Sequence, residues 1–447
     1  KNNNDDIDNT EFKRLLDDLE HEIGQEVDAR EQNNNKIIFS IENRPHRQPQ
    51  AASLLQATLR AGYSWHVVDF IKKEALPHYE QWEKEGCMPK SFWQKFGEQG
   101  FLCMDVPEAY GGSGFDFSFS SMILEEVRRL GIDFGVAVHS DIVAPYILKY
   151  GTEEQKQRFL PKMVSGEWIG CIGMSEPSAG SDLKSLKTVA TDMGDHYLIN
   201  GSKTFITNGY VADFVLCACR TNKGTESEGI SLIFIEKERD GFTTGQPFEK
   251  IGIKCQDTCE LFFEDVKVPK ENLLGDEGLG FRLMMNELPR ERLGIAVEAL
   301  GTAIGVVEKT LQYVTERRAF NKAIADFQNT QFKLADCAAE VQVYQSFLDR
   351  CVELQMEHKL TTEQASIAKF KATDMLDKVV DECLQLHGGY GYIWEYDVAR
   401  AYAAARVTRI YGGTNEIMKL IISRGLFKEH YLAEKRKARS NGALEKQ

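Results

Sequence analysis

The sequence predicts an α+β protein in which a helical region, a region of strands and a second helical region follow one another. Apolar residues recur at helical spacing from about residue 52 to 166, alternate as in strands from about 167 to 270, and return to helical spacing from about 276 to 430. No helical segment interrupts the strands. We therefore expect an antiparallel sheet, folded as a barrel or sandwich, and not a doubly wound domain.

These changes of period divide the chain into five parts. A polar tail, which we expect to be disordered, precedes an N-terminal helical domain, a middle β domain, a C-terminal helical bundle and a second polar tail. Their predicted bounds are 1–50, 51–166, 167–274, 275–431 and 432–447. At 447 residues the chain is long enough for two or three packed domains.

Two patterns define helices in the N-terminal helical domain. Ser118 to Leu130 is amphipathic. Thr152 to Gln155 has the sequence of a capping box, which predicts the start of a helix that ends near Val164. Gly111 to Gly114 is expected to form a loop between helical segments.

Short alternating runs separated by turn residues predict the strands of the middle domain. Thr188 to Asp192 and Tyr197 to Ile199 alternate on either side of Gly194. Asn200-Gly201 then predicts a hairpin turn before a strand at Lys203 to Thr207. The remaining expected strands are Phe214 to Cys219, Ile230 to Glu236 and Leu261 to Val268.

The C-terminal region contains three long helical patterns. They run from Leu293 to Arg317, from Gln328 to His358 and from Thr362 to His387. Each is long enough for a bundle helix, which indicates a four-helix bundle core.

Composition excludes several classes of protein. The hydrophobic content of 42% and charged content of 27% are ordinary for a globular protein. No apolar run approaches the roughly 20 residues that span a bilayer, so we expect no stable membrane insertion. The net charge of −14 argues against a nucleic-acid partner, but a few local donors would still hold a phosphate-bearing ligand.

The ten cysteines and the N-terminal tail carry no recognisable site. There is no CxxC pair and no cysteine pair beside histidines at zinc spacing, so we expect no metal, and buried reduced thiols in a reducing compartment. Phe12 to Ile23 has apolar residues at helical spacing, but we prefer a solvated tail. The tail is not acid-poor and does not look like a transit peptide as it stands.

Three segments together point to a family. Gly173 to Asp182 ends a strand and enters a loop rich in Gly, Ser and Pro, whose backbone N–H groups and hydroxyls suit a polar ligand. No G-x-G-x-x-G pattern follows a strand, so a Rossmann-type site is unsupported. With Gln385 to Tyr392 and Ile410 to Ile417, the loop resembles the FAD-dependent acyl-CoA dehydrogenases, most closely their long-chain branch. The order of elements matches that family's fold from about residue 60 to 430.

The resemblance implies FAD as the cofactor. By position, Met174 and Ser175 lie at the isoalloxazine ring, and Phe205 stacks on it where the family commonly has Trp. Arg317 resembles the arginine that reaches the FAD pyrophosphate of a neighbouring subunit, and a structural role is the better interpretation of His387. The predicted cofactor-binding residues are Met174, Ser175, Phe205, Ile206, Thr207, Arg317, Phe320, Gln328, Gln385, Leu386, His387, Gly388, Gly389, Thr414, Asn415 and Glu416.

The catalytic base is not where most of the family carries it. Many members have a glutamate at the position of Gly412, which has no side chain and cannot act as a base. A minority branch supplies the glutamate from an earlier helix, at the motif where this chain has Glu291. We therefore predict Glu291 as the base, with burial raising its pKa toward neutrality. The alternative is a surface glutamate paired with Arg290 or Arg292.

The reaction implied by the resemblance is α,β-dehydrogenation of a medium- to long-chain acyl-CoA to trans-2-enoyl-CoA. The base removes the pro-R α-proton while hydride leaves the β-carbon for flavin N5. The thioester carbonyl is expected to accept hydrogen bonds from the flavin ribityl 2′-hydroxyl and the Gly412 N–H. Glu416 is a second candidate base, although its position matches the cofactor side. The predicted substrate-binding residues are Ser181, Pro289, Arg290, Arg292, Tyr411, Gly412 and Gly413.

Partners and compartment also follow from the resemblance. We expect a homotetramer, a dimer of dimers, that passes electrons to electron-transferring flavoprotein, because acyl-CoA oxidases are generally much longer. The expected compartment is the mitochondrial matrix in a eukaryote and the cytoplasm in a bacterium. Two alternatives remain open: an isovaleryl-CoA or other branched short-chain acyl-CoA dehydrogenase, and a low-turnover binding or assembly relative of the same fold.

Overall fold

The computed structural model describes residues 51–221, 229–428, 430 and 432. The chain divides into two compact units, residues 1–66 and 67–447. Helix α2, Ala51–Glu74, crosses the boundary between them. The predicted tail at 1–50 and residues 433–447 of the second predicted tail lie outside the described residues.

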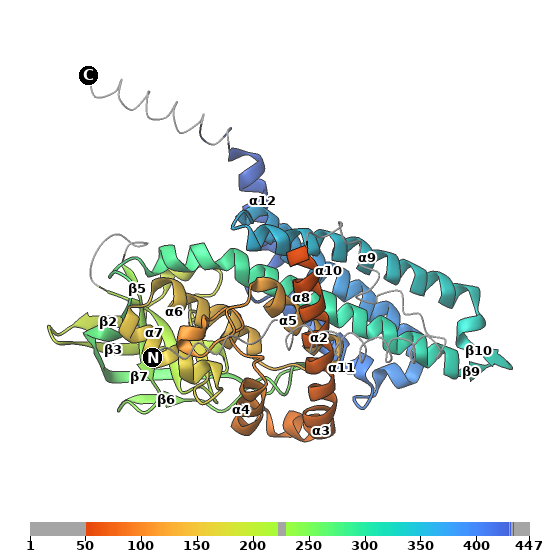
Figure 1. The fold of residues 1–447 in the computed structure, drawn as a ribbon, viewed down its shortest axis with the longest axis horizontal. Helices are drawn as coiled ribbons and strands as arrows, with labels where there is room; N and C mark the ends of the chain where they lie inside the picture. The colour runs from red at the N-terminus through yellow and green to blue at the C-terminus, as the bar shows by residue number, and fades with distance from the viewer. Residues whose placement is uncertain (1–50, 222–228, 429, 431, 433–447) are drawn as a thin grey trace, which may run out of the picture. The chain divides into compact units, whose positions relative to one another are not determined.

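Helices precede the sheet, as predicted (Figure 1). After α2 come α3 Leu76–Glu85, α4 Lys90–Glu98, α5 Phe117–Arg129, the π-helix η3 Ala137–Val143, α6 Ala144–Tyr150 and α7 Glu153–Val164. An aromatic cluster forms their core, with neighbouring ring centroids 5.0–5.8 Å apart. Its members are Phe70, Phe92, Phe96, Phe101 and Phe134.

Helix α7 confirms the predicted capping box. The Thr152 hydroxyl accepts from the Gln155 N–H, and the Gln155 side chain accepts from the Thr152 N–H, so two orphan donors of the helix start are satisfied. The Gln155 amide also donates to the carbonyls of Glu271 and Leu273. The cap therefore also ties α7 to the segment that leaves the sheet.

The middle region forms one eight-stranded sheet in the order β6-β7-β3-β2-β4-β5-β8, with β1 beside β4. Its strands are β1 Gly170–Gly173, β2 Val189–Asp192, β3 His196–Thr207, β4 Phe214–Arg220, β5 Ile230–Glu236, β6 Phe242–Thr244, β7 Thr258–Pro269 and β8 Leu273–Leu274. Two pairings, β1 with β4 and β2 with β4, are parallel. The prediction of a purely antiparallel sheet was therefore wrong in part, because β1 enters from helices and not from a hairpin.

The predicted hairpin turn at Asn200-Gly201 was also wrong. The chain passes through these residues within the continuous strand β3, where the register against β7 shifts between Ile199 and Gly201. Gly201 has φ +147°, and a Cβ there would lie 2.6 Å from the Thr188 hydroxyl. The pair therefore forms a bulge, and the turn between β2 and β3 lies around Gly194 instead.

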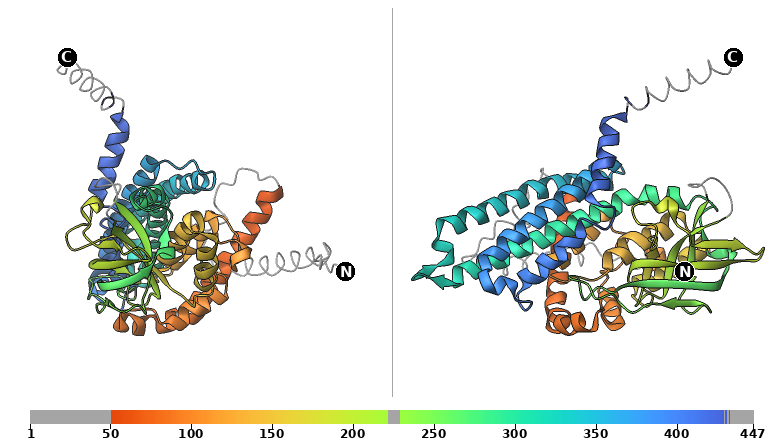
Figure 2. Two further views of the ribbon diagram at one scale, coloured as in Figure 1. Left: turned by 90° about the vertical axis from the view of Figure 1, so that its left-hand side faces the viewer. Right: turned by 180° about the vertical axis from the view of Figure 1, so that it is seen from behind.

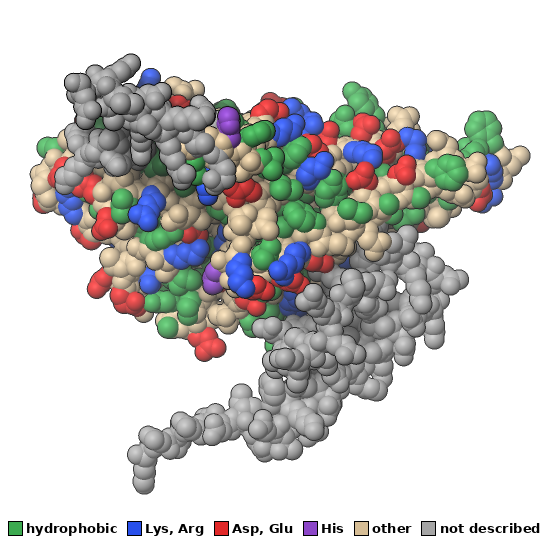
Figure 3. Space-filling model, turned by 90° about the horizontal axis from the view of Figure 1, so that it is seen from above, with side chains coloured by type: hydrophobic (Ala, Val, Ile, Leu, Met, Phe, Trp, Pro, Cys, Tyr) green, Lys and Arg blue, Asp and Glu red, His purple; other side chains and the backbone are tan. Residues whose placement is uncertain are grey.

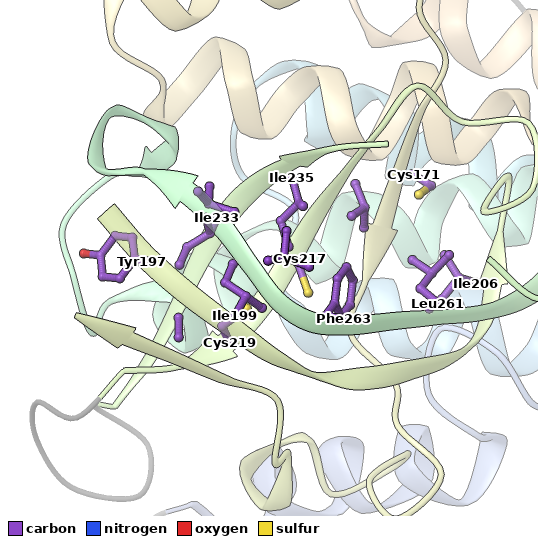
Figure 4. Close-up of a cluster of buried hydrophobic side chains, with 14 of the residues drawn as sticks. Cys171, Tyr197, Ile199, Ile206, Cys217, Cys219, Ile233, Ile235, Leu261 and Phe263 are labelled. Carbon is purple, nitrogen blue, oxygen red and sulfur yellow. The ribbon is translucent and has the colours of Figure 1, made fainter. Parts of the chain in front are cut away.

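The sheet encloses a hydrophobic core contributed by β1 to β5 and β7 (Figure 4). Residues such as Ile199, Cys217 and Phe263 are almost completely buried in it. Beside the core, the Lys203 ammonium lies 2.7 Å from Glu176, and both side chains are buried. Glu176 also accepts from the backbone N–H groups of Lys187 and Thr188, so every group of this buried pair has partners.

The C-terminal region is a bundle of long helices (Figure 2). Its helices are α8 Gly280–Glu316, α9 Gln328–Met356, α10 Thr362–His387, α11 Asp397–Thr408 and α12 Asn415–Leu426. Helix α10 has the predicted bounds and contacts each of the other four. Helix α8 begins 13 residues before the predicted Leu293 and continues through Pro289. The proline removes one backbone N–H, but buried residues such as Leu283 and Met284 continue the hydrophobic face on its N-terminal side.

The histidine of the π-helix links the helices to the sheet. His139 is fully buried, its Nε2 lies 3.0 Å from the Met163 carbonyl oxygen, and its Nδ1 accepts from the Gly170 N–H. Burial lowers the pKa of His139 to about 4, so the ring is neutral and Nε2 carries the proton. The start of β1 is thereby fixed.

Four features of the described residues bear on membrane spans, metal sites, thiols and surface charge. No described helix is long and apolar enough to cross a membrane, and the described residues include no cluster of metal-ligating side chains. All ten cysteines are free thiols, and nine are buried. On the face shown in Figure 3, acidic and basic side chains are intermixed.

The buried Lys203–Glu176 pair generates a stability prediction. We expect Lys203→Met to lower the free energy of unfolding by about 3–5 kcal/mol, because it leaves a buried carboxylate without its cation. The exposed Lys84–Glu80 pair provides the control, and Lys84→Met should cost about 0.5 kcal/mol or less. Equilibrium urea unfolding at matched protein concentration measures both; equal effects of the two substitutions would contradict the prediction.

Candidate active site

Glu291 lies in α8 with its side chain almost completely buried, 9% exposed. The Tyr146 hydroxyl of α6 donates to its Oε1 at 3.1 Å. Burial raises the pKa of Glu291 to about 7, even though the Tyr146 hydrogen bond lowers it. A carboxylate with this pKa exchanges protons near neutrality, as a general base must.

The two arginines that flank Glu291 in sequence do not form ion pairs with it. Arg290 pairs with Asp105 at 2.7 Å and with Asp141 of the π-helix at 3.3 Å. The Arg292 Nε donates to the Gly412 carbonyl at 3.3 Å. The alternative of a surface glutamate paired with either arginine is therefore wrong. The charge of Arg290, which we predicted to bind substrate, is satisfied by two carboxylates of this chain.

The Gly412-Gly413 turn lies against the same face of α8. Both glycines have positive φ, +64° and +91°. A Cβ at Gly412 would lie 2.3 Å from Cδ1 of Ile295, so a side chain there would strain the backbone and displace that isoleucine. Ile295 follows Glu291 by four residues and shares its helix face. Glu291 therefore lies one helical turn from the residue that packs against Gly412.

A buried lysine holds the other half of this turn. Lys369 of α10 is fully buried and donates to the Gly413 carbonyl and to the Asn415 Oδ1, both at 2.9 Å. Burial lowers the pKa of Lys369 to about 8. Arg292 and Lys369 thus bind successive carbonyls of the turn from two helices, which fixes the peptide planes that follow Gly412 and Gly413.

Tyr411 and Thr414, the predicted residues on either side of the Gly412-Gly413 turn, have different hydrogen-bonding and charged neighbours. The Tyr411 hydroxyl is buried, and burial and the charge of Glu298 raise the pKa of that phenol while Arg128 lowers it. Thr414 caps α12 by accepting from the Ile417 N–H at 3.3 Å.

Asn415 and Glu416 differ in how far they are available to a ligand. The Asn415 amide is used by Lys369 and Asp374. Glu416 is exposed, and its pKa is lowered by hydrogen bonds from its own backbone N–H and from Thr414. An exposed carboxylate with a lowered pKa does not suit the base.

A second group of residues forms around the end of β1. The Ser175 carbonyl accepts from the Thr204 N–H at 3.0 Å, which joins the loop after β1 to a second bulge in β3, where the register against β7 shifts between Lys203 and Ile206. In that bulge Phe205 has φ +60° and a ring that is 70% exposed. Met174 is tied to the same strand, because Lys203 donates to its carbonyl at 3.3 Å.

The remaining residues of this group differ in exposure. Ile206 points into the core of the sheet, and Thr207 accepts from Gln256 at 3.3 Å. Ser181 is exposed in the following loop, whereas Pro289 is half-buried in α8.

A third group lines a pocket of about 550 Å³ at the far end of α8. Arg317 lies with its guanidinium 5.2 Å from the centre of the Tyr390 ring. His387 is stacked on Tyr313 at 4.2 Å and hydrogen-bonded to the Cys383 carbonyl, contacts that favour the structural role predicted from the sequence. The pocket is lined by Tyr313, Arg317, Ala319, Ile324, Gln385, Leu386, His387, Gly388, Gly389, Tyr390 and Ile393.

Two further predicted cofactor residues, Phe320 and Gln328, follow Arg317 in the sequence but do not line this pocket. Phe320 and Asn321, both with positive φ, form the turn of a hairpin of β9 Arg318–Ala319 and β10 Lys322–Ala323, and the Phe320 ring is 90% exposed. Gln328 is exposed at the start of α9. Both side chains are free to contact another molecule.

The residues present fit a flavin dinucleotide. For the ring system, an exposed aromatic ring, Phe205, stands beside the loop of Met174 and Ser175. For the phosphates, the Arg317 guanidinium lines the separate pocket at the far end of α8, where a Cβ added to Gly388 or Gly389 would meet no atom within 4 Å. Such open backbone and a fixed cation suit a pyrophosphate.

Sequence reasoning missed the residues that support Glu291. Tyr146, Glu287, Ile295 and Lys369 belong to no site that the sequence analysis predicted. Glu287 and Glu291 are spaced i, i+4 on a helix, and that spacing was the available signal.

Comparison with known proteins covers nearly all of the described chain. Family models described as the N-terminal, middle and C-terminal domains of acyl-CoA dehydrogenase match residues 64–167, 171–266 and 278–427. The long-chain specific acyl-CoA dehydrogenase of Sus scrofa mitochondria is 45% identical over 358 residues, 79% of this chain and 83% of that protein. The short-chain specific enzyme of Rattus norvegicus mitochondria is 36% identical over 384 residues, 86% of this chain and 91% of that protein.

A solved structure agrees with the sequence relatives. The crystal structure of acyl-CoA dehydrogenase from Geobacillus kaustophilus superimposes with a TM-score of 0.80 at 48% identity, over 85% of this chain and 99% of that one. The three matched domains, the sequence relatives and the fold all point to the same family. The chain belongs to the acyl-CoA dehydrogenase family of flavin-dependent oxidoreductases.

Proposed function

We propose that this chain dehydrogenates medium- to long-chain acyl-CoA thioesters to trans-2-enoyl-CoA, with Glu291 as the base for the α-proton. One observation carries the proposal. Glu291 is buried, has its pKa raised to about 7, and lies one helical turn from the residue that packs against Gly412. The similarity to long-chain enzymes supports the chain-length class.

Two polar groups of this chain are proposed to act on the substrate, one on the α-proton and one on the thioester carbonyl. The Glu291 carboxylate takes the α-proton, and the Gly412 N–H donates to the thioester carbonyl as negative charge develops on its oxygen. Arg292 and Lys369 hold the two carbonyls that follow this donor, Gly412 O and Gly413 O, and so anchor the turn that carries it. Ser181 and Tyr411 are proposed to line the path of the substrate.

FAD, when bound, supplies the acceptor for the hydride that leaves the β-carbon. We propose that Met174, Ser175 and the Phe205–Thr207 segment hold its ring system. The proposed contacts to the dinucleotide come from Arg317, Phe320, Gln328, the Gln385–Gly389 segment and the Thr414–Glu416 segment, with Asn415 able to act only through its backbone.

The length of α8 supports the proposed homotetramer. Glu291 and Arg317 are both carried by α8 and are separated by about 39 Å along its axis, at 1.5 Å per residue. That separation exceeds the length of an extended FAD molecule. Arg317 would therefore serve the cofactor of a second copy, as a dimer of dimers allows.

The electron acceptor and the compartment extend this proposal. We propose electron-transferring flavoprotein as the acceptor, and the mitochondrial matrix or a bacterial cytoplasm as the location. A branched short-chain substrate such as isovaleryl-CoA remains the alternative within the family.

The base is tested by anaerobic titration of the FAD-loaded protein with palmitoyl-CoA, followed by the visible flavin absorbance. We expect bleaching in the wild type and, in Glu291→Gln, retained FAD with reduction slowed about 100-fold or more. Glu416→Gln, compared alongside, tests the other candidate. If Glu416→Gln loses reduction and Glu291→Gln keeps it, the assignment is wrong. If the wild-type protein holds FAD but none of the acyl-CoA substrates reduces it, the chain is better explained as a non-catalytic relative.

The raised pKa of Glu291 generates a pH prediction. The base acts only as the carboxylate, so kcat/KM should fall about tenfold per pH unit below pH 7 and level off above it. The profile of kcat/KM reports the free enzyme and can be measured with palmitoyl-CoA and an artificial electron acceptor. An acid limb centred near the ordinary glutamate pKa of about 4.3 would show that Glu291 is not desolvated.

A further inference from the structure

Helix α6 presents three polar side chains to two carboxylates of α8. The Tyr146 hydroxyl donates to Glu291 at 3.1 Å. One turn farther along α6, the Lys149 ammonium and the Tyr150 hydroxyl both lie 2.6 Å from Glu287. Residues 146, 149 and 150 share one helix face, as do 287 and 291, so the two faces match turn for turn.

The two carboxylates have unequal partners. Glu287 is 3% exposed, and its carboxylate forms an ion pair with the Lys149 ammonium. Among the described residues, no lysine or arginine forms an ion pair with Glu291, and Tyr146 is its hydrogen-bond donor. A fixed negative charge therefore lies one helical turn from a carboxylate that has no cation of its own.

We propose that Tyr146 and Glu287 are positioning residues that act on Glu291 in opposite directions, the hydroxyl favouring its carboxylate form and the neighbouring charge favouring its acid form. This inference rests on the proposed function, in which Glu291 is the base. Neither residue belongs to a motif of the sequence analysis.

The electrostatics of the cluster support the proposal. Burial is the largest cause of the raised pKa of Glu291, the Tyr146 hydrogen bond lowers the pKa, and the Glu287 charge raises it. Arg292 on the same helix also lowers it.

The other charged groups nearby are already paired. Arg290 is held between Asp105 and the Asp141 of the π-helix, and Lys369 of α10 is directed to the Gly413 carbonyl. After burial, Tyr146 and Glu287 have the largest effects on the pKa of Glu291, so their removal should change that pKa most.

Tyr146 also fixes which carboxylate oxygen is free. Its hydroxyl binds Oε1 of Glu291. The other oxygen, Oε2, is left to approach a substrate. Tyr146 is itself fully buried, so this arrangement is set before any ligand arrives.

The test measures the proton affinity of Glu291 without turnover. Infrared difference titration of the FAD-loaded protein follows the carboxylic acid band, which is assigned to Glu291 by its loss in Glu291→Gln. We expect Tyr146→Phe to raise the pKa of Glu291 by about one pH unit and Glu287→Gln to lower it by about one. The acid limb of flavin reduction by palmitoyl-CoA should move in the same directions.

Tyr110→Phe is the matched control, because its hydroxyl donates to Glu153 at the surface, away from α8. It should leave the pKa of Glu291 unchanged. FAD content and the thermal unfolding midpoint identify a variant that fails to fold, and the two substitutions test the proposal independently.

The outcomes separate this inference from the proposed function. If Tyr146→Phe and Glu287→Gln both titrate like the wild type, or move together in one direction, the inference is overturned. If the shifts appear but no acyl-CoA reduces the wild-type flavin, the coupling stands and the proposed reaction fails.

Discussion

The structure around the site depends on the burial of one carboxylate, that of Glu291. A buried glutamate with a pKa near 7 is useful only if nothing neutralises it, yet Glu291 lies between two arginines in sequence. Helical geometry resolves the conflict, because consecutive residues point about 100° apart. Arg290 is thereby directed to Asp105 and Asp141, and Arg292 to the backbone at Gly412. Each charge is satisfied without cancelling the central one.

Helix α8 also carries the residues that contact the Gly412-Gly413 turn. Glu291, Arg292 and Ile295 are part of one rigid element, so the distance from the carboxylate to the turn does not depend on a loop. Lys369 approaches the turn from α10 and completes its anchoring. Two buried cations on successive carbonyls orient the adjacent N–H groups, which is a form of electrostatic preorganisation.

The sequence predicted those features whose physical cause is local. The capping box at Thr152 and the bounds of α10 were correct, because caps and hydrophobic period act over a few residues. The bulge at Asn200-Gly201 was mistaken for a turn, because the partner strand that decides the matter lies far along the chain. Glu291 was found only because a vacant position elsewhere required a base. Tyr146 could not be found, since its importance comes from a contact across 145 residues.

The contact between Ile295 and Gly412 has an evolutionary consequence. The two positions are far apart in sequence, but they share one small volume in which a Cβ and the end of the isoleucine do not both fit. A lineage that regains a side chain at 412 must also accommodate change at 295, whereas loss of that side chain opens room for a larger residue on α8. Across relatives, the position of the proton acceptor and the size of residue 295 should therefore change together.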